Sequence, residues 1–224
     1  AYAAWVARAA AHVRSIDARH AITIGSAGRG VRPTVERIDF AAEHLDEAVD
    51  FATVQLWPRD WGWVAAAAPV PAVASFDPLE LALGNATSYL TSHVKLLVAA
   101  KHRERPLVLS AFGFPRDDDQ GPRPTTEPTS VASDTSASLR DAFFRRLLEH
   151  AAQAIKKKNH GALVGSMVHA WAGEGRARHT LWREGDAYIG DPPSDRQGLY
   201  SVYDTDTSTV NVLRAHALAL RPYK

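Results

Sequence analysis

Four short apolar segments, separated by longer stretches of helical periodicity, restrict the folds open to this chain. Each segment has the length of a strand, and together they comprise residues 21–24, 51–57, 106–109 and 162–169. Apolar residues recur at helical spacing in residues 2–16, 38–48, 79–100, 139–157 and 210–220. Strands that alternate with helices in this way form a parallel sheet with right-handed crossovers. The sequence therefore predicts an α/β fold of four strand–helix units, which is half of an eightfold barrel.

Composition favours a folded domain and excludes several classes of function. Of the 224 residues, 46% are hydrophobic and 23% are charged, which suits a packed core. The 26 basic and 25 acidic side chains leave a net charge of +1, so we expect neither a nucleic-acid partner nor an anionic membrane partner. The absence of cysteine excludes disulfides and thiolate metal sites, and no apolar run reaches transmembrane length.

The segment at residues 106–117 is the most informative for function. It begins as a short apolar run bounded by Pro106, which is typical of a buried strand in a parallel sheet. It ends in Phe112-Gly113-Phe114, followed by a Pro-Arg-Asp turn. In an α/β barrel the carboxyl ends of the strands carry the chemistry. We therefore expect a functional site at this end.

Four segments resemble the β-mannanase-like branch of glycoside hydrolase family 5. They are residues 15–26, residues 49–61, residues 106–117, and residues 169–176 together with 190–193 and 197–209. The resemblance implies a (β/α)8 TIM barrel, in which residues 1–224 are the C-terminal half and supply the fourth helix and strands five to eight. It also implies a secreted or extracellular protein. The polar stretch 118–136 is expected to be a flexible insertion loop.

The resemblance also implies that half of the barrel is missing. The first four strands, including the Asn-Glu-Pro segment that holds the acid/base glutamate in the family, have no counterpart in this sequence. The chain begins at Ala1 without an initiator Met or a signal peptide, as a processed chain or part of a longer one would. Half a barrel leaves unpaired strand edges and an open core. We expect a second polypeptide, or an N-terminal part of the same one, to complete it.

The position of the family's nucleophile is occupied by alanine. In the family, strand seven ends in two acidic residues before Phe-Gly; here these positions are Ser110 and Ala111. A retaining glycosidase needs two carboxylates, and alanine cannot attack an anomeric carbon. The site departs from the family at three more positions, Gln55, Trp57 and Ala27. Four changes in one pocket favour natural loss of catalysis over an engineered knockout, and no catalytic residue is assigned.

Candidate carbohydrate contacts follow from the same resemblance. Trp171 matches the family's tryptophan that forms the base of the sugar site, and an indole face can stack on the apolar face of a pyranose. The other candidates are Trp57, Gln55, Trp61 and Glu174. Two alternatives stay open: the tryptophans, including Trp63, form either a sugar platform or the packing of the barrel mouth.

The remaining polar residues of the last segment have simpler explanations. Glu174 and Asp191 are acids on the eighth-strand loop, and bracing of the loop through Arg176 or Arg183 is favoured over a replacement nucleophile. His169, at a position where the family usually has tryptophan, and His179 lack the spacing of metal ligands. We therefore expect no metal and no cofactor.

Three functions are compatible with these observations. The first is a barrel half that has lost catalysis and serves as a structural or interaction subunit, with residual glycan binding. The second is an endo-β-1,4-mannanase seen as a fragment or inactivated variant. The third is a lectin-like mannan binder. A glutamate at position 111 in the native gene would favour the enzyme, whereas bound sugar without turnover would favour the lectin.

Overall fold

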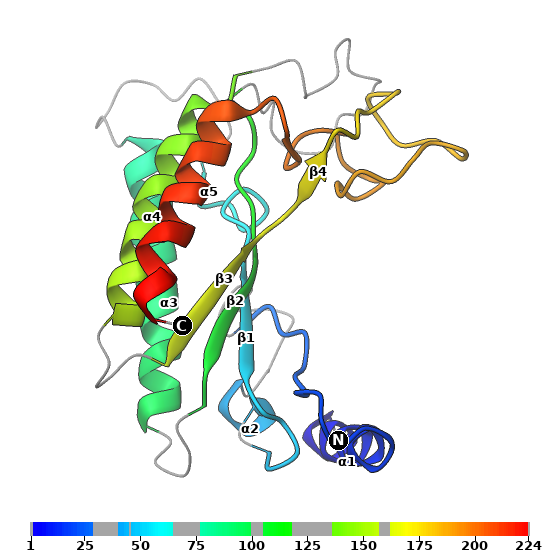
Figure 1. Cartoon of the computed structure of the whole chain (residues 1–224), viewed down its shortest axis with the longest axis vertical. Coiled ribbons are helices and arrows are strands. Elements are labelled where there is room, and N and C mark those ends of the chain that lie inside the picture. Colours follow the sequence, from blue (N-terminus) through cyan, green and yellow to red (C-terminus); the bar gives the residue numbers. More distant parts are fainter. Residues whose placement is uncertain are drawn as a thin grey trace. The chain divides into compact units, whose positions relative to one another are not determined.

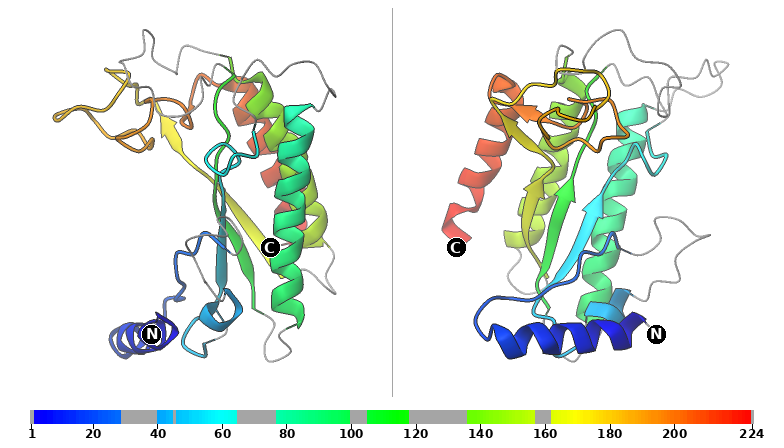
Figure 2. Two further views of the ribbon diagram at one scale, coloured as in Figure 1. Left: turned by 180° about the vertical axis from the view of Figure 1, so that it is seen from behind. Right: turned by 90° about the vertical axis from the view of Figure 1, so that its right-hand side faces the viewer.

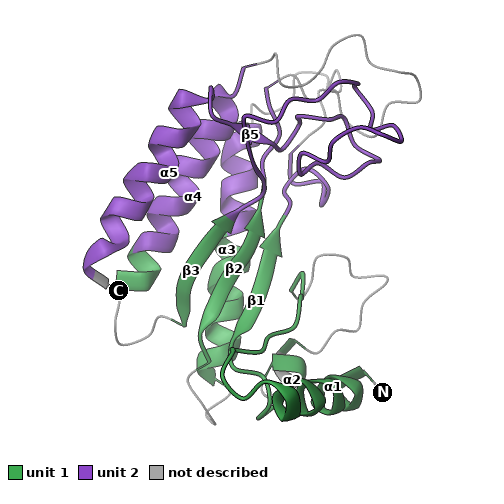
Figure 3. Cartoon of the chain, turned by 45° about the vertical axis from the view of Figure 1, so that its right-hand side comes forward, with its two compact units in different colours: residues 1–56, 87–112, 153–167 green, residues 57–86, 113–152, 168–224 purple. Residues whose placement is uncertain are grey.

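The computed structural model forms two compact units, which we describe separately (Figure 3). Unit 1 comprises residues 1–56, 87–112 and 153–167, and unit 2 comprises residues 57–86, 113–152 and 168–224. The structure describes residues 2–28, 40–44, 46–64, 77–99, 105–117, 136–156 and 162–223. The proposed insertion loop therefore lies outside the described residues, except for its last residue, Ser136.

Unit 1 contains a three-stranded sheet. Its strands are β1 (Ala52–Leu56), β2 (Leu107–Phe112) and β3 (Leu163–Val168), in the order β1-β2-β3 (Figure 1). β1 and β2 pair in parallel, and the three strands lie side by side in the right-hand view of Figure 2. Two long helices connect them in sequence, α3 (Pro78–Ala99) and α4 (Ser138–Lys156). The predicted parallel α/β arrangement is confirmed for these strands.

Where the apolar pattern of the sequence is strong, the observed strands lie close to the predicted ones. β1 is almost fully buried, as a continuous apolar run predicts, and β2 buries Leu107 and Leu109 completely. β2 continues three residues beyond the predicted end at position 109, through Ser110 and Ala111 to Phe112. The Ser110 hydroxyl supports this extension, because it donates to the Val54 carbonyl of β1 at 3.2 Å.

The predicted strand at residues 21–24 is wrong. This segment lies along β1, but much of its bonding uses side chains instead of a backbone ladder. The amide of Ile22 donates to the Asp50 carboxylate at 2.7 Å, and the Asp50 amide donates to the Ile22 carbonyl at 2.8 Å. The Thr53 hydroxyl donates to the Ile24 carbonyl at 2.5 Å. Side chains that occupy backbone partners in this way compete with regular secondary structure.

The helices before β1 also differ from expectation. The helix predicted over residues 38–48 is short, because only α2 (Phe40–His44) is helical among its described residues. Beyond α2, the Asp46 carboxylate accepts a hydrogen bond from the Ala48 amide at 3.0 Å. This hydrogen bond stabilises a turn and not a continuation of the helix.

The first helix, α1 (Tyr2–Ile16), has the predicted bounds, and several of its apolar residues are exposed. Its buried residues are Val6 and Ala10. Three other apolar residues of this helix are exposed, namely Trp5 at 55%, Val13 at 48% and Ile16 at 76%. The described part of unit 1 therefore covers one edge of the apolar stripe and leaves its centre in solvent.

Unit 2 contains the start of α3, most of α4, two short strands and the last helix. The strands are β4 (Trp171–Gly173) and β5 (Val202–Tyr203), which pair in parallel. The helix α5 (Thr207–Leu220) continues into the short 3-10 helix η2 (Arg221–Tyr223). Phe114 stacks on Phe143 of α4, with ring centroids 4.4 Å apart. Within the described residues, no helix combines the length and apolar character that crossing a membrane requires.

Candidate functional site

The strand ends of unit 1 bring together two of the candidate site residues. Gln55 of β1 and Ala111 of β2 are Cα partners, directly after a register shift between Val54 and Gln55. Both side chains are partly exposed, in contrast to the buried residues Leu56 and Phe112 that follow them. The pair therefore consists of an amide and a methyl group, neither of which is a nucleophile towards a sugar.

Trp57, the residue after β1, belongs to an aromatic cluster in unit 2. Its ring meets His169 edge-on at 5.0 Å between centroids, and Tyr200 edge-on at 5.4 Å. Gly113 makes this contact possible, because a Cβ atom there would lie 2.7 Å from Trp57 Cζ3 and 2.9 Å from Tyr200 Cδ1. The geometry favours packing over a sugar platform for Trp57.

Trp171 is arranged differently from Trp57. It lies on β4 opposite Val202 and is 58% exposed. Glu174 follows in the adjoining turn and is also exposed. Both residues have the accessibility that a sugar contact requires, and an indole exposed to this degree is the most accessible aromatic platform among the candidate tryptophans.

Trp61 and Trp63 form a pair of their own. Their rings meet edge-on with centroids 4.8 Å apart, and both are partly exposed. Nearby, the Tyr200 hydroxyl donates to the Asp60 carboxylate at 3.1 Å, which connects this turn to the aromatic cluster. The structure therefore brings Trp57, Tyr200 and the turn at residues 58–62 together within unit 2.

Asp191 organises the loop before β5. Its buried carboxylate accepts hydrogen bonds from the amides of Gly198 and Tyr200, at 2.8 and 2.7 Å, and from the Ser201 hydroxyl at 2.5 Å. Burial raises the pKa of Asp191, while these hydrogen bonds act in the opposite direction. Asp191 thus braces the loop through backbone amides and a hydroxyl, whereas the sequence favoured bracing through Arg176 or Arg183. Arg176 pairs with Asp204 instead.

A buried ion cluster beside this loop was not expected from the sequence. Asp206, at the N-cap position of α5, accepts hydrogen bonds from Arg116 at 2.6 Å and from Arg140 at 3.0 Å. Arg140 also donates to the Ser201 carbonyl and to the Thr209 hydroxyl, both at 3.0 Å. Burial opposes ionisation of Asp206, but the Tyr203 amide and the two arginines hold its pKa below the usual value. The cluster holds the loop against α4 and α5.

The two histidines have separate hydrogen-bonding partners. His169 Nε2 is 3.0 Å from the Gly190 carbonyl, whereas His179 Nδ1 is 2.9 Å from the Asp186 carboxylate. In the part of the chain that the structure describes, no group of three His, Cys, Asp or Glu side chains is placed to hold a metal ion.

Comparison with known proteins identifies the family. The chain matches the model of the glycoside hydrolase family 5 β-mannosidase-like family over residues 1–224. It is 25% identical over 234 aligned positions to a putative mannan endo-1,4-β-mannosidase 5 of Oryza sativa subsp. japonica, covering 98% of this chain and 39% of the relative. It is 28% identical to mannan endo-1,4-β-mannosidase F of Aspergillus fumigatus, over 60% of this chain and 28% of that protein.

Solved structures show the same fold. The chain superposes on a family 5 mannosidase from Rhizomucor miehei with a TM-score of 0.71 and 24% identity, over 97% of this chain and 48% of that one. It also resembles an endo-1,4-β-D-mannanase from Thermotoga petrophila, with a TM-score of 0.57, 17% identity and coverage of 97% and 51%. These likenesses imply a TIM-barrel fold. The chain spans about half the length of these solved structures, and less of the two curated relatives.

Proposed function

This chain belongs to the glycoside hydrolase family 5 β-mannosidase-like family, and on that basis we propose that it is a member that has lost catalysis and retains a structural and glycan-binding role. In this proposal the chain supplies strands five to eight of the barrel. The expected nucleophile position is Ala111, and the exposed Trp171 is the main sugar contact.

The observation that carries the proposal is the pairing of Gln55 with Ala111 at the strand ends. Retaining glycosidases place two carboxylates about 5–5.5 Å apart across the scissile bond. Ala111 supplies no carboxylate at the nucleophile position, its partner Gln55 is an uncharged amide, and the preceding Ser110 has its hydroxyl directed to the Val54 carbonyl. Removing a covalent nucleophile costs a retaining enzyme many orders of magnitude in rate.

Completion of the barrel by a second polypeptide, or by an N-terminal part of the same one, is the second element of the proposal. Two features of unit 1 support it. The described sheet has three strands, where a closed barrel has eight. In addition, α1 exposes the centre of its apolar stripe, which a neighbouring helix or sheet would cover.

Hydrolysis of mannan tests the loss of catalysis. We expect no release of reducing ends by the unmodified protein, while a β-1,4-linked manno-oligosaccharide still binds and quenches tryptophan fluorescence. The matched variant is Ala111→Glu. Hydrolysis by the unmodified protein would refute the proposal outright.

The names of the curated relatives favour one second candidate, an endo-β-1,4-mannanase of which this chain is one part. Activity that is absent in the unmodified protein but gained by Ala111→Glu would support an inactivated mannanase, because the acid/base carboxylate would then have to be present. No activity in either protein, together with sugar binding, is the result that our proposal predicts.

A further inference from the structure

One side chain, Arg176, ties together the turn that carries Trp171 and Glu174. Nη1 of Arg176 donates to the Gly173 carbonyl at 3.0 Å and to the Gly175 carbonyl at 3.1 Å. These two carbonyls precede and follow Glu174, so a single nitrogen atom spans the turn. The backbone on both sides of Glu174 is therefore held by the same guanidinium group.

The other half of the Arg176 guanidinium is anchored on β5 and on the residues that follow it. Nη2 donates to the Asp204 carboxylate at 2.6 Å and to the Thr205 hydroxyl at 3.1 Å. The guanidinium carbon lies 4.5 Å from the centroid of the Tyr203 ring, which is buried. A cation–π contact with a buried ring restrains the guanidinium further. Since both terminal nitrogens donate twice, Arg176 connects a buried part of unit 2 to the exposed turn.

Trp171 lies against the backbone that Arg176 holds. A Cβ atom at Gly173 would be 3.3 Å from Nε1, 3.7 Å from Cε2 and 4.0 Å from Cζ2 of the Trp171 indole. These three atoms are consecutive along one side of the ring system, so this side of the indole rests on Gly173. Gly173 has a φ of 59°, which residues with a side chain rarely adopt. The orientation of the indole therefore depends on where the backbone of residue 173 lies.

We propose that Arg176 is the positioning residue for sugar binding at Trp171 and Glu174. It acts through the backbone of residues 173–175 and not on the sugar itself. The inference rests on the proposed function, because it deepens the sugar contact assigned there to Trp171. Side chains that are held in place before a ligand arrives lose less conformational entropy on binding. An exposed arginine–carboxylate pair contributes little to stability, so this role predicts a loss of binding without a loss of fold.

The indole N–H signal of Trp171 in a proton–nitrogen correlation spectrum tests the positioning without any ligand. Trp171→Phe removes this signal and so identifies it. Arg176→Ala should shift or broaden it, because residue 173 loses one of its hydrogen bonds. Asp204→Ala removes an anchor of the guanidinium and should act in the same direction. Arg178→Ala removes an exposed arginine, and thus the same charge, from the same loop, and should leave the signal in place. A signal unchanged by Arg176→Ala would overturn the proposal.

Calorimetric titration with a β-1,4-linked manno-oligosaccharide tests the consequence for binding. Arg176→Ala should weaken binding by about 3- to 10-fold, the cost of immobilising one further side chain in the complex. It should lower the unfolding temperature by less than about 3 °C. Arg176→Lys should recover little of the binding, because an ammonium group keeps the charge but lacks the planar arrangement of donors. Full recovery with lysine, or unchanged binding by Arg176→Ala, would contradict the proposal.

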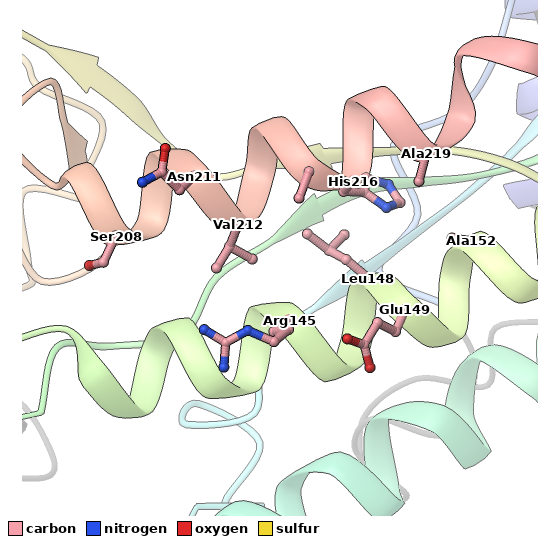
Figure 4. A pocket seen from close by; sticks show the side chains of 10 residues that line it. Arg145, Leu148, Glu149, Ala152, Ser208, Asn211, Val212, His216 and Ala219 are labelled. Atoms are coloured by element: carbon pink, nitrogen blue, oxygen red, sulfur yellow. The ribbon is translucent and has the colours of Figure 1, made fainter.

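A groove in unit 2 offers the sugar another place to bind. It lies between α4 and α5, has a volume of about 520 Å³ and is lined by side chains of both helices (Figure 4). None of the lining residues that the structure describes is a tryptophan, tyrosine or phenylalanine, so the groove lacks a large aromatic face for a pyranose. Ala215→Phe would occupy part of the groove and should leave sugar binding unchanged.

The same titrations separate this inference from the proposed function. Binding that is lost in Ala215→Phe but kept in Arg176→Ala would place the sugar in the groove and overturn the inference. An unmodified protein that binds no manno-oligosaccharide would refute the glycan-binding part of the proposed function. In that case the Trp171 signal still decides whether Arg176 positions the indole, because its measurement needs no sugar.

Discussion

Gln55 and Ala111 are Cα partners across the parallel register of β1 and β2, immediately after the register shift that follows Val54. Ala111 is partly exposed, whereas Leu109, two residues earlier on β2, is fully buried. Side chains in a strand alternate between faces, but the shift at this end alters the alternation locally. Position 111 therefore offers solvent access that the preceding part of β2 does not have.

A carboxylate should consequently be tolerated at position 111. We expect Ala111→Glu to change the free energy of unfolding by less than about 1 kcal/mol, as substitutions at accessible sites usually do. Leu109→Glu, the control on the same strand, buries an unpaired carboxyl group and should cost more than about 4 kcal/mol. Urea unfolding followed by circular dichroism measures both. Equal destabilisation by the two variants would show that position 111 is closed to a charged side chain.

Substitution of Trp171 should affect sugar binding, whereas substitution of Trp57 should affect stability. Trp171→Ala should abolish binding of a β-1,4-linked manno-oligosaccharide and leave the unfolding midpoint nearly unchanged, because Trp171 is largely exposed. Trp57→Ala removes the ring between His169 and Tyr200 and should cost about 3 kcal/mol. Calorimetric titration and thermal unfolding provide the two readouts. Binding that survives Trp171→Ala would exclude this residue as the main contact.

Gly113 is a third position with a specific expectation. A methyl group there would lie 2.7 Å from Trp57 Cζ3, so Gly113→Ala should destabilise the protein by about 1–3 kcal/mol through overpacking. The matched control is Gly84→Ala in α3, where a Cβ atom would meet nothing within 4 Å. That change should stabilise by about 0.5–1 kcal/mol, because alanine favours a helix more than glycine does. Opposite signs in chemical unfolding are the expected result.

The sequence predicted the elements with strong local patterns and missed those that depend on distant partners. The long runs of helical periodicity gave α3 and α4 with ends within one residue of those observed. The strand expected at residues 21–24 does not form, because the side chains of Asp50 and Thr53 hydrogen-bond to its backbone. A pattern of apolar residues does not predict such side-chain hydrogen bonds. The apolar spacing of α1 predicted amphipathicity correctly, but a stripe does not reveal what covers it.

The ion cluster around Asp206 shows a similar limit at the candidate site. Arg116 and Asp206 are 90 residues apart, and Arg140 and Asp206 are 66 apart, so no local motif joins them. One signal was available. Arg140 precedes Phe143, Phe144 and Leu147 at helical spacing, which places a charged residue on the apolar face of α4 and indicates a buried partner for it.

Burial should determine how much each of two arginine–aspartate pairs contributes to stability, because the two pairs have the same N···O distance. Arg116–Asp206 and Arg176–Asp204 both have N···O distances of 2.6 Å, but Arg116 is 2% exposed and Arg176 is 41% exposed. Asp206→Ala leaves two buried arginines without their carboxylate and should cost about 3–5 kcal/mol. Asp204→Ala should have an effect several times smaller, because solvent screens the exposed pair. Similar losses in urea unfolding would contradict this assignment.

Acid should remove the contribution of Asp206. The pKa of Asp206 in the folded protein lies below its ordinary value of 3.8, so between these two values the unfolded chain binds more protons than the folded chain does. Stability from this group is therefore fully present above about pH 4 and is lost as the pH falls through the lower, folded-state pKa. Asp206→Asn keeps the shape of the side chain and has no such titration.

We expect the difference in unfolding free energy between the unmodified protein and Asp206→Asn to be constant from neutral pH down to about pH 5, and to shrink below about pH 4. Urea unfolding of both proteins at a series of pH values measures this difference, and a difference that stays constant down to the acid limit would show that Asp206 is not held ionised by Arg116 and Arg140.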